Sequence, residues 1–295
     1  MGNLYTDYKC IQCLLRRYAD IDSSKASDKD KTLYMKELLK IISDAPPTMR
    51  APEIIEKITT LQGKYKIETV DYTAIKKRYN ALLLSLADEL WKQIKEDENS
   101  LYLAMCYAFT GNYIDFGALS DITEEKLCAL LKNAKNVSFD KNEFSQFEKE
   151  LSVSKNLVYL TDNCGEIVLD MLFIKLIKEK FPEIEISVIV RGKNVLNDAT
   201  MDDVYQIGLD KIAYVTHNGS GIAGTVLGKI SEEASVLINK ADIIISKGMG
   251  NFETISGAGL NIYYMFLCKC EKFCKEFNAP KLSYMLLNDR SLNKK

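Results

Sequence analysis

The sequence predicts an α/β fold, a three-layer α/β/α arrangement with a mostly parallel sheet, preceded by an all-helical N-terminal subdomain. Two observations support this prediction. Up to about residue 155, the apolar residues recur at helical spacing with almost no strand pattern. Beyond that point, short runs rich in β-branched residues alternate with helical segments, which is typical of a parallel sheet covered on both faces. We therefore expect a helical subdomain at 1–155 and an α/β domain at 156–295.

The N-terminal half predicts a series of helices with recognisable starts and stops. Apolar residues at 11, 14, 15 and 18 share one helical face. The Pro-Pro pair at 46–47 ends the next helix, and Pro52 suits the first turn of a third. Further helices are expected along 75–94 and 101–110. Thr123 and Asp140 are expected helix N-caps, and Asp140 is followed three residues later by Glu143, as in a capping box.

The second half predicts strands that alternate with helices. One helix is expected between the first two strands, at Glu166–Lys180. The expected strands are Leu157–Thr161, Ile186–Val190, Lys211–Val215, Asp242–Ser246 and Leu260–Leu267. The polar stretch 148–156 is the expected linker between the two halves.

The composition excludes several classes of protein. The chain has 295 residues, of which 47% are apolar and 27% charged, as in an ordinary folded protein. Its 39 Lys and Arg against 41 Asp and Glu give a net charge of −2, so a strongly basic nucleic-acid footprint is absent. No apolar run reaches the roughly 18 residues of a membrane span. We therefore expect no nucleic-acid partner and no membrane partner.

The histidine and cysteine counts are more specific. The single histidine, His217, excludes metal sites that need two histidines, and without a second cue a structural role is favoured for it. The N-terminus lacks the pattern of a signal peptide. The eight cysteines therefore indicate reduced thiols in a cytoplasmic protein, at positions 10, 13, 106, 128, 164, 268, 270 and 274.

The loops that follow the first two expected strands are rich in acids and amides. In a parallel sheet the ligand site lies beyond the carboxyl ends of the strands. Asp162 and Asn163 stand there at the start of a helix, a place that suits a phosphate or a hard divalent cation. If Asp162 and Asp198 point into one crevice, a cation between them relieves their repulsion. A plainer interpretation stays open, in which these residues only cap the helices that follow.

The third and fourth loops suggest phosphate contacts. Asn218, Gly219 and Ser220 lie in a glycine-rich loop whose N–H groups suit a phosphate, although a simple flexible turn explains them equally well. Lys247 directly follows an apolar strand and precedes two glycines, which makes it a candidate phosphate contact as a point charge. Asn251, four residues later, either holds this loop or reaches the site.

Eight short strings together make the chain recognisable. It resembles the damage-control metal-dependent phosphatases (ARMT-like, formerly a domain-of-unknown-function family), in their mostly prokaryotic branch. The strings occur in the order of that family and run through nearly the whole chain. They are CIQCLLR at 10–16, APEIIEKI at 51–58, DYTAIKKRYN at 71–80, GNYIDFG at 111–117, TDNCGEIVLD at 161–170, LNDAT at 196–200, NGSGIAGTVL at 218–227 and SKGMGNFET at 246–254.

The resemblance implies a fold, a cofactor and a set of roles. It implies the same helical subdomain on a three-layer catalytic domain. It implies a divalent metal, such as Mn, Mg, Co or Ni, held by Asp162, Asn163 and Asp198. It also implies that Lys247 contacts the substrate phosphate near the Asn218–Ser220 loop, and that Glu166 supports the site from its helix. The sequence departs from the family at Gly221–Gly224 and at Met249, where the family usually has Gln, so these departures concern the substrate-facing side.

The resulting hypothesis is metal-dependent hydrolysis of the phosphomonoesters of small metabolites, such as sugar phosphates or damaged phosphometabolites. The nucleophile is either a water activated by the metal or the Asp162 carboxylate. Water is favoured, because the second Asp of the usual Asp-x-Asp phosphatase signature would stand where this chain has Cys164.

Two alternatives to a phosphatase stay open. One is an S-adenosylmethionine-dependent methyltransferase, since the loop after the first strand faintly resembles a nucleoside-binding loop. The other is a non-enzymatic metal-binding protein, in which Cys10 and Cys13 join Cys268, Cys270 or Cys274.

Overall fold

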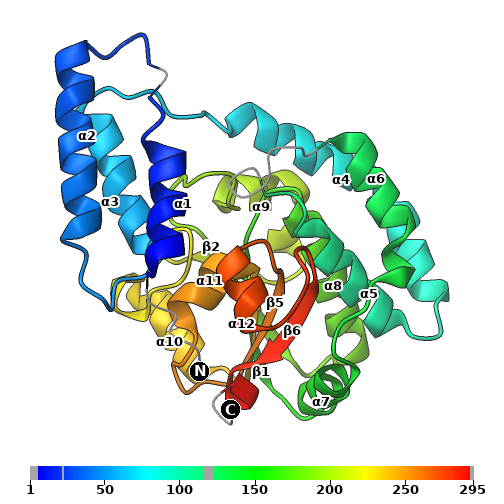
Figure 1. Cartoon of the computed structure of the whole chain (residues 1–295). Helices are drawn as coiled ribbons and strands as arrows, with labels where there is room; N and C mark the ends of the chain where they lie inside the picture. Colours follow the sequence, from blue (N-terminus) through cyan, green and yellow to red (C-terminus); the bar gives the residue numbers. More distant parts are fainter. Residues whose placement is uncertain (1–5, 22, 116–122, 293–295) are drawn as a thin grey trace.

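The computed structural model describes residues 6–21, 23–115 and 123–292. Its N-terminal half is helical, as the apolar periodicity predicts (Figure 1). The helices are α1 (Tyr8–Tyr18), α2 (Asp28–Ser43), α3 (Ala51–Lys64), α4 (Thr73–Glu96), α5 (Ser100–Gly111), α6 (Glu124–Lys132) and α7 (Lys141–Leu151). Thr123 and Asp140 cap α6 and α7 with their side chains, and Pro52 lies in the first turn of α3, so these three predictions are confirmed.

The second half alternates strands and helices. Its elements are β1 (Asn156–Leu160), α8 (Glu166–Lys180), β2 (Glu185–Val190), α9 (Met201–Ile207), β3 (Tyr214–His217), α10 (Glu232–Lys240), β4 (Ile243–Lys247), α11 (Gly248–Ile255), β5 (Ile262–Leu267), α12 (Glu271–Glu276), β6 (Tyr284–Asn288) and α13 (Asp289–Leu292). Three 3₁₀ turns complete the list, at Ala134–Asn136, Leu209–Lys211 and Leu227–Lys229.

The sheet has six strands in the order β3-β2-β1-β4-β5-β6. The first five are parallel to one another, whereas β6 pairs antiparallel with β5. The chain runs outward from β1 to β3 and then crosses back to β4 beside β1. The strand order therefore reverses between β1 and β4, and such a reversal opens a crevice at the carboxyl ends of the strands.

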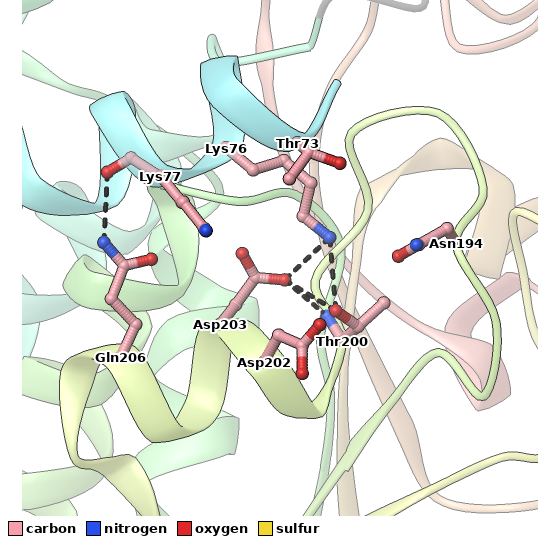
Figure 2. Close-up of a pocket in the computed structure, with 8 residues that line it drawn as sticks. All are labelled: Thr73, Lys76, Lys77, Asn194, Thr200, Asp202, Asp203 and Gln206. Carbon is pink, nitrogen blue, oxygen red and sulfur yellow. Dashed lines mark hydrogen bonds and ion pairs between the residues drawn. The ribbon is translucent and has the colours of Figure 1, made fainter. Parts of the chain in front are cut away.

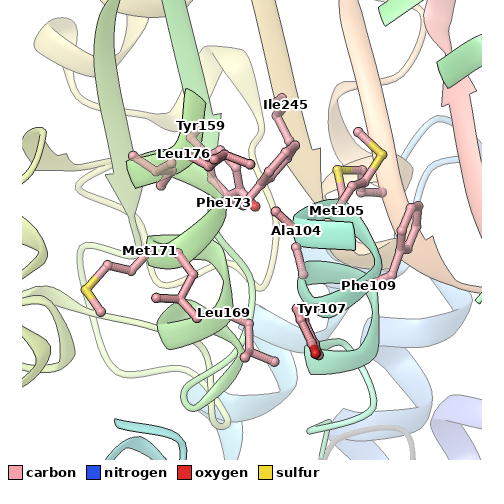
Figure 3. Packing of buried hydrophobic residues seen from close by; sticks show 14 of the residues in the cluster. Ala104, Met105, Tyr107, Phe109, Tyr159, Leu169, Met171, Phe173, Leu176 and Ile245 are labelled. Carbon is pink, nitrogen blue, oxygen red and sulfur yellow. The ribbon is translucent and has the colours of Figure 1, made fainter. Parts of the chain in front are cut away.

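Helices cover both faces of this sheet, which confirms the expected fold class. Along β1, Leu157 and Tyr159 point into one core, and Val158 and Leu160 point into the other, as alternation in a strand requires. The first core also contains α4, α5, α7 and α8, and Figure 3 shows side chains of α5 and α8 packed against Tyr159 of β1 and Ile245 of β4. The second core contains α10, α11 and α12.

The helical half contributes to two separate cores. Helices α1, α2 and α3 enclose a small core of their own, around Tyr34, Leu38, Ile54 and Ile58, and Figure 1 shows these helices as a group beside the α/β part. Helices α4 to α7 instead share the core of the sheet. The division into 1–155 and 156–295 stays a prediction. Within the first of these halves, α1–α3 pack around a core separate from the one that α4–α7 share with the sheet.

Three local expectations differ from the structure. The third strand begins at Tyr214, because residues 209–211 form a 3₁₀ turn. The expected linker overlaps α7, which continues to Leu151 because Phe147 and Leu151 are buried in the core. Strand β6 was not expected at all. Residues 116 and 117 of the Gly111–Gly117 string lie outside the described residues. No helix in the described ranges has the length and apolar character that a membrane crossing requires.

Replacing Ile58 with Ala tests whether α1–α3 form a separate core. Its side chain is fully buried in that core. We expect the truncation to cost about 2–5 kcal/mol, because it leaves a cavity. Hydrogen exchange should accelerate in α1–α3 and remain slow in β1 and β4. Leu39→Ala, at an exposed position of α2, is the matched control. Equal loss of protection in the sheet would show that both cores unfold as one unit.

Candidate metal- and phosphate-binding site

The predicted site residues meet at the crevice between β1 and β4. Asp162 and Asn163 follow β1, Asp198 lies in the loop after β2, and Lys247 is the last residue of β4. All four are buried. An isolated β-bridge joins Asn163 to Asp198 and brings the two loops together.

Arg191 connects the two acids of the predicted metal set. Its Nε donates to Asp198 Oδ2 over 2.6 Å, and its Nη2 lies 3.7 Å from Asp162 Oδ1. Its Nη1 donates to Asn251 Oδ1 and to the carbonyl oxygen of Gly224. The two carboxylates therefore face one guanidinium group inside the protein.

Neither acid caps a helix, so the plainer interpretation of these residues is wrong. The N-cap of α8 is Gly165, with φ at 68°, and that of α9 is Thr200, which forms a capping box with Asp203. The Asn163 side chain donates to Asp162 and Glu166 instead of accepting from the helix. Asp162 and Asp198 are thus buried acids without a helix-capping role.

An amide and a glutamate complete the surroundings of Asp162. Asn112, the C-cap of α5, donates through Nδ2 to Asp162 Oδ2 over 3.0 Å and to both Glu166 oxygens over 3.1 Å. Its Oδ1 accepts from the backbone N–H of Leu267 at the end of β5. Glu166 therefore contacts Asn112 and Asn163 from α8, and its role in supporting the site stays a prediction.

The electrostatics of the acid pair favour a cation. Burial raises the pKa of Asp162 well above its ordinary value, and the charges of Asp198, Glu166 and Asp115 raise it further, against Arg191. Burial also raises the pKa of Asp198, which Arg191 opposes. A cation between the acids would allow both to ionise.

The donor set fits a hard divalent ion. Asp162 and Asp198 offer carboxylate oxygens and Asn163 an amide oxygen, the ligands that Mg²⁺ and Mn²⁺ prefer. Within the part of the chain that the structure describes, no three His, Cys, Asp or Glu side chains gather as a metal site requires. The fit therefore depends on two carboxylates and one amide.

Lys247 lies deeper than a surface phosphate contact would. Its side chain is 0% exposed, and its Nζ donates to the Ala108 carbonyl (3.0 Å) and to Asp170 Oδ1 (2.5 Å) and forms an ion pair with Glu166 Oε1 (2.7 Å). Burial raises the pKa of Asp170 to about 7, against the charge of Lys247. Lys247 thus neutralises two acids on one face of α8.

The polar side chains of the third loop, Asn218–Ser220, accept hydrogen bonds from nearby backbone N–H groups. Asn218 Oδ1 accepts from the N–H groups of Gly192 and Ser220, and Ser220 Oγ accepts from Ile222. The N–H of Gly219 donates to His217 Nδ1, so this histidine has a local structural contact. Asn251 holds the fourth loop in place, because its Nδ2 donates to the carbonyls at 161 and 247.

Comparison with known proteins gives this site its context. The sequence profile of the damage-control phosphatase ARMT1-like domain matches residues 6–284. This chain belongs to the damage-control phosphatase ARMT1-like family.

Two archaeal proteins with similar sequences are named damage-control phosphatases. "Damage-control phosphatase PH1575" of Pyrococcus horikoshii is 28% identical over 289 residues, which cover 96% of this chain and 98% of the relative. A "Damage-control phosphatase" of Archaeoglobus fulgidus is 32% identical over 280 residues, covering 92% and 94%. The crystal structure of PH1575, described as a DUF89 family protein, has the same fold, with a TM-score of 0.79 at 24% identity over 97% of this chain and 99% of that one.

The sequence interpretation missed several residues of this candidate site. Arg191 directly follows β2, the position that drew attention to Lys247 after β4, so its place in the chain was a usable signal. Asn112 and Asn197 lie in two of the family-like strings, at 111–117 and 196–200, but nothing in the local pattern assigned either of them a role. Asn197 donates through Nδ2 to Asn163 Oδ1 over 3.0 Å, whereas its own Oδ1 is buried with no hydrogen bond in the structure.

A cavity of about 270 Å³ lies beside the Asp198 loop, between α4 and α9 (Figure 2). Lys76 crosses from α4 to its wall, where its Nζ donates to the Asp198 carbonyl over 2.8 Å and pairs with Asp203 over 2.7 Å. The Lys77 side chain points into the space between the helices (Figure 2). Lys76 therefore fixes the backbone of the Asp198 loop from the helical half of the chain.

The cysteines do not form the alternative metal site in the described residues. All eight are free thiols, and no group of three or more metal-binding side chains includes them. Cys268 and Cys274 lie with their sulfurs 3.5 Å apart. Burial raises the pKa of Cys268 to about 12, which keeps it a neutral thiol at ordinary pH.

Replacing Gly248 with Ala tests how closely α11 approaches Asp162. A Cβ at this position would lie 2.0 Å from Asp162 Oδ2, and φ is +79°. We expect the variant to bind Mn²⁺ at least tenfold more weakly, because the carboxylate must move away. Isothermal titration measures this. Gly228→Ala, where a Cβ meets nothing within 4 Å, is the control. Unchanged Mn²⁺ affinity would argue against Asp162 as a ligand.

Glu253 of α11 predicts a pH dependence of stability. Burial raises its pKa from 4.5 to about 7, against the charges of Lys272 and Arg50. The native state therefore holds this proton at pH values where the unfolded chain has lost it. The contribution of this group to the free energy of unfolding is therefore present at low pH and is lost as pH rises from 4.5 to about 7. Glu253→Gln should flatten the fall in melting temperature between pH 5 and 8, whereas Glu276→Gln, exposed at the end of α12, should leave it unchanged.

Proposed function

We propose that this protein is a metal-dependent phosphatase that hydrolyses phosphomonoesters of small metabolites, with sugar phosphates or damaged phosphometabolites as the substrate class. One observation carries the proposal: the loops that contain Asp162, Asn163 and Asp198 meet at the edge of the sheet where the strand order reverses. Membership in a family of damage-control phosphatases supports the same conclusion.

In this proposal, Asp162, Asn163 and Asp198 hold a divalent ion such as Mn²⁺, Mg²⁺, Co²⁺ or Ni²⁺. When bound, such an ion supplies positive charge to the phosphoryl oxygens. Asn112 orients the Asp162 carboxylate through its contact with Oδ2, and Arg191 orients Asp198. These partners hold the oxygens in place before the substrate arrives, which is the condition for effective electrostatic catalysis.

The attacking group in this proposal is water. Asp162 Oδ2 accepts from both Asn112 and Asn163, and these amide donors stabilise the carboxylate and reduce its nucleophilicity. Cys164, which stands where the Asp-x-Asp signature has its second acid, is buried, and burial raises its pKa to about 12. A neutral thiol of this kind does not accept a proton at ordinary pH.

The phosphate contacts of the proposal come from the other two loops. Lys247 ends β4 and Asn251 follows it, the loop Asn218–Ser220 follows β3, and Glu166 of α8 pairs with Lys247. For Lys247 to touch a phosphate, its Nζ must release Glu166, Asp170 or the Ala108 carbonyl. In the arrangement described, its contribution is the positive charge that it places behind the site.

Asp162→Ala and Asp198→Ala test the proposal directly. Each removes a carboxylate from the donor set, so metal-dependent phosphate release should fall at least a hundredfold. The assay is a panel of phosphomonoesters, sugar phosphates included, with each of the four divalent ions.

Asp210→Ala, at an exposed position after α9, is the control and should keep full activity. Full activity in both site variants would contradict the assignment. Titration of the unmodified protein with S-adenosylmethionine tests the methyltransferase alternative, for which we expect no binding.

A further inference from the structure

The two cationic side chains of the site, Lys247 and Arg191, differ in how many of their nitrogen atoms have hydrogen-bond partners. Lys247 has three donors and three oxygen partners, and it is fully buried. Arg191 is also buried, and its Nε and Nη1 have partners. Its Nη2 is different, because it is buried without any hydrogen bond.

A guanidinium nitrogen that makes no hydrogen bond is costly to bury, even beside an acid at ion-pair distance. A guanidinium group carries five N–H donors, and leaving part of a buried charged group without a partner forfeits free energy. Here the rest of the group is held rigidly by Asp198, Asn251 and the Gly224 carbonyl. The free donor is therefore fixed in position and not left over from a mobile side chain.

Nη2 lies beside the more exposed of the two acids. Nη2 lies 3.7 Å from Asp162 Oδ1, too far for a hydrogen bond. The Asp162 side chain is 11% exposed, against 5% for Asp198 and 1% for Arg191. A ligand that approaches Asp162 from solvent therefore meets Nη2 beside it.

The charges of the site indicate what that ligand is. Asp162 and Asp198 carry two negative charges when ionised, and Arg191 carries one positive charge. Addition of a divalent ion makes this group positive by one charge. Such a group attracts an anion, and a planar guanidinium is well suited to phosphate oxygens.

We propose that Arg191 is a catalytic residue whose Nη2 donates a hydrogen bond to a phosphoryl oxygen of the substrate. Its Nε holds Asp198 at the same time, so one side chain joins the metal-binding acid to the transferred group. This inference rests on the proposed phosphatase function and deepens it, because it assigns a substrate contact to a residue outside the predicted site.

The test separates metal binding from phosphate binding. Isothermal titration measures the affinity for Mg²⁺ alone, and then for inorganic phosphate with Mg²⁺ present. In Arg191→Lys, phosphate should bind about tenfold more weakly or worse, because a charged hydrogen bond is lost. In Arg191→Gln, phosphate should weaken likewise while Mg²⁺ binds at least as tightly, because a positive charge has left the acid pair.

The changes in phosphate affinity and in Mg²⁺ affinity together distinguish a substrate contact from a structural role. A purely structural arginine would lower both affinities together. Lys193→Gln removes a positive charge two residues away, at an exposed position, and should change neither affinity. Unchanged phosphate affinity in both Arg191 variants overturns the inference.

A crystal structure of the unmodified protein with Mg²⁺ and orthovanadate tests the contact without any substitution. We expect a vanadate oxygen within hydrogen-bonding distance of Nη2. Vanadate bound beside Asp162 and Asp198 but away from Arg191 would overturn this inference and leave the proposed function standing. Failure of the protein to bind vanadate, together with absence of phosphatase activity, would overturn both.

Discussion

Two like-charged carboxylates, Asp162 and Asp198, are buried side by side, and the rest of the site depends on how their charge is balanced. An ionised acid in the protein interior needs a proton or a cation near it. Arg191 supplies one positive charge between the two acids, which leaves room for a second cation. Behind them, Lys247 balances Glu166 and Asp170 in the same way. The site thus contains two pairs of acids, and each pair contacts one basic residue.

The helical half of the chain contributes residues to this arrangement and is not only an addition to the α/β half. Asn112, at the end of α5, reaches Asp162 and Glu166, and Lys76 of α4 holds the backbone of Asp198. Asn80, also on α4, accepts from the N–H of Gly165 at the start of α8. The same two helices, α4 and α5, also share the core of the sheet, whereas α1–α3 enclose a separate one.

Lys247 shows where sequence interpretation reaches its limit. Its place at the end of an apolar strand was predicted from the sequence, and it stands at the end of β4. Its partners follow from α8, where Glu166 and Asp170 are four residues apart and so share a helical face. That spacing was visible in the sequence, but not that α8 packs this face against the end of β4. The same residue type at a strand end can face solvent or two buried acids, and only packing decides between them.

The sequence by itself determined the secondary structure of most elements, the positions of Asp162, Asn163 and Lys247 at strand ends, and that of Asp198 in the loop after β2. Hydrophobic periodicity and turn residues act over a few residues, so they can be read locally. Tertiary structure alone decided the strand order, the antiparallel β6 and the partners of the acids. Asn112 and Asp162 are 50 residues apart in the chain, and such long-range contacts leave no periodic signal. The convergence of these groups arises because β1 and β4 become neighbours, which depends on how the whole sheet packs.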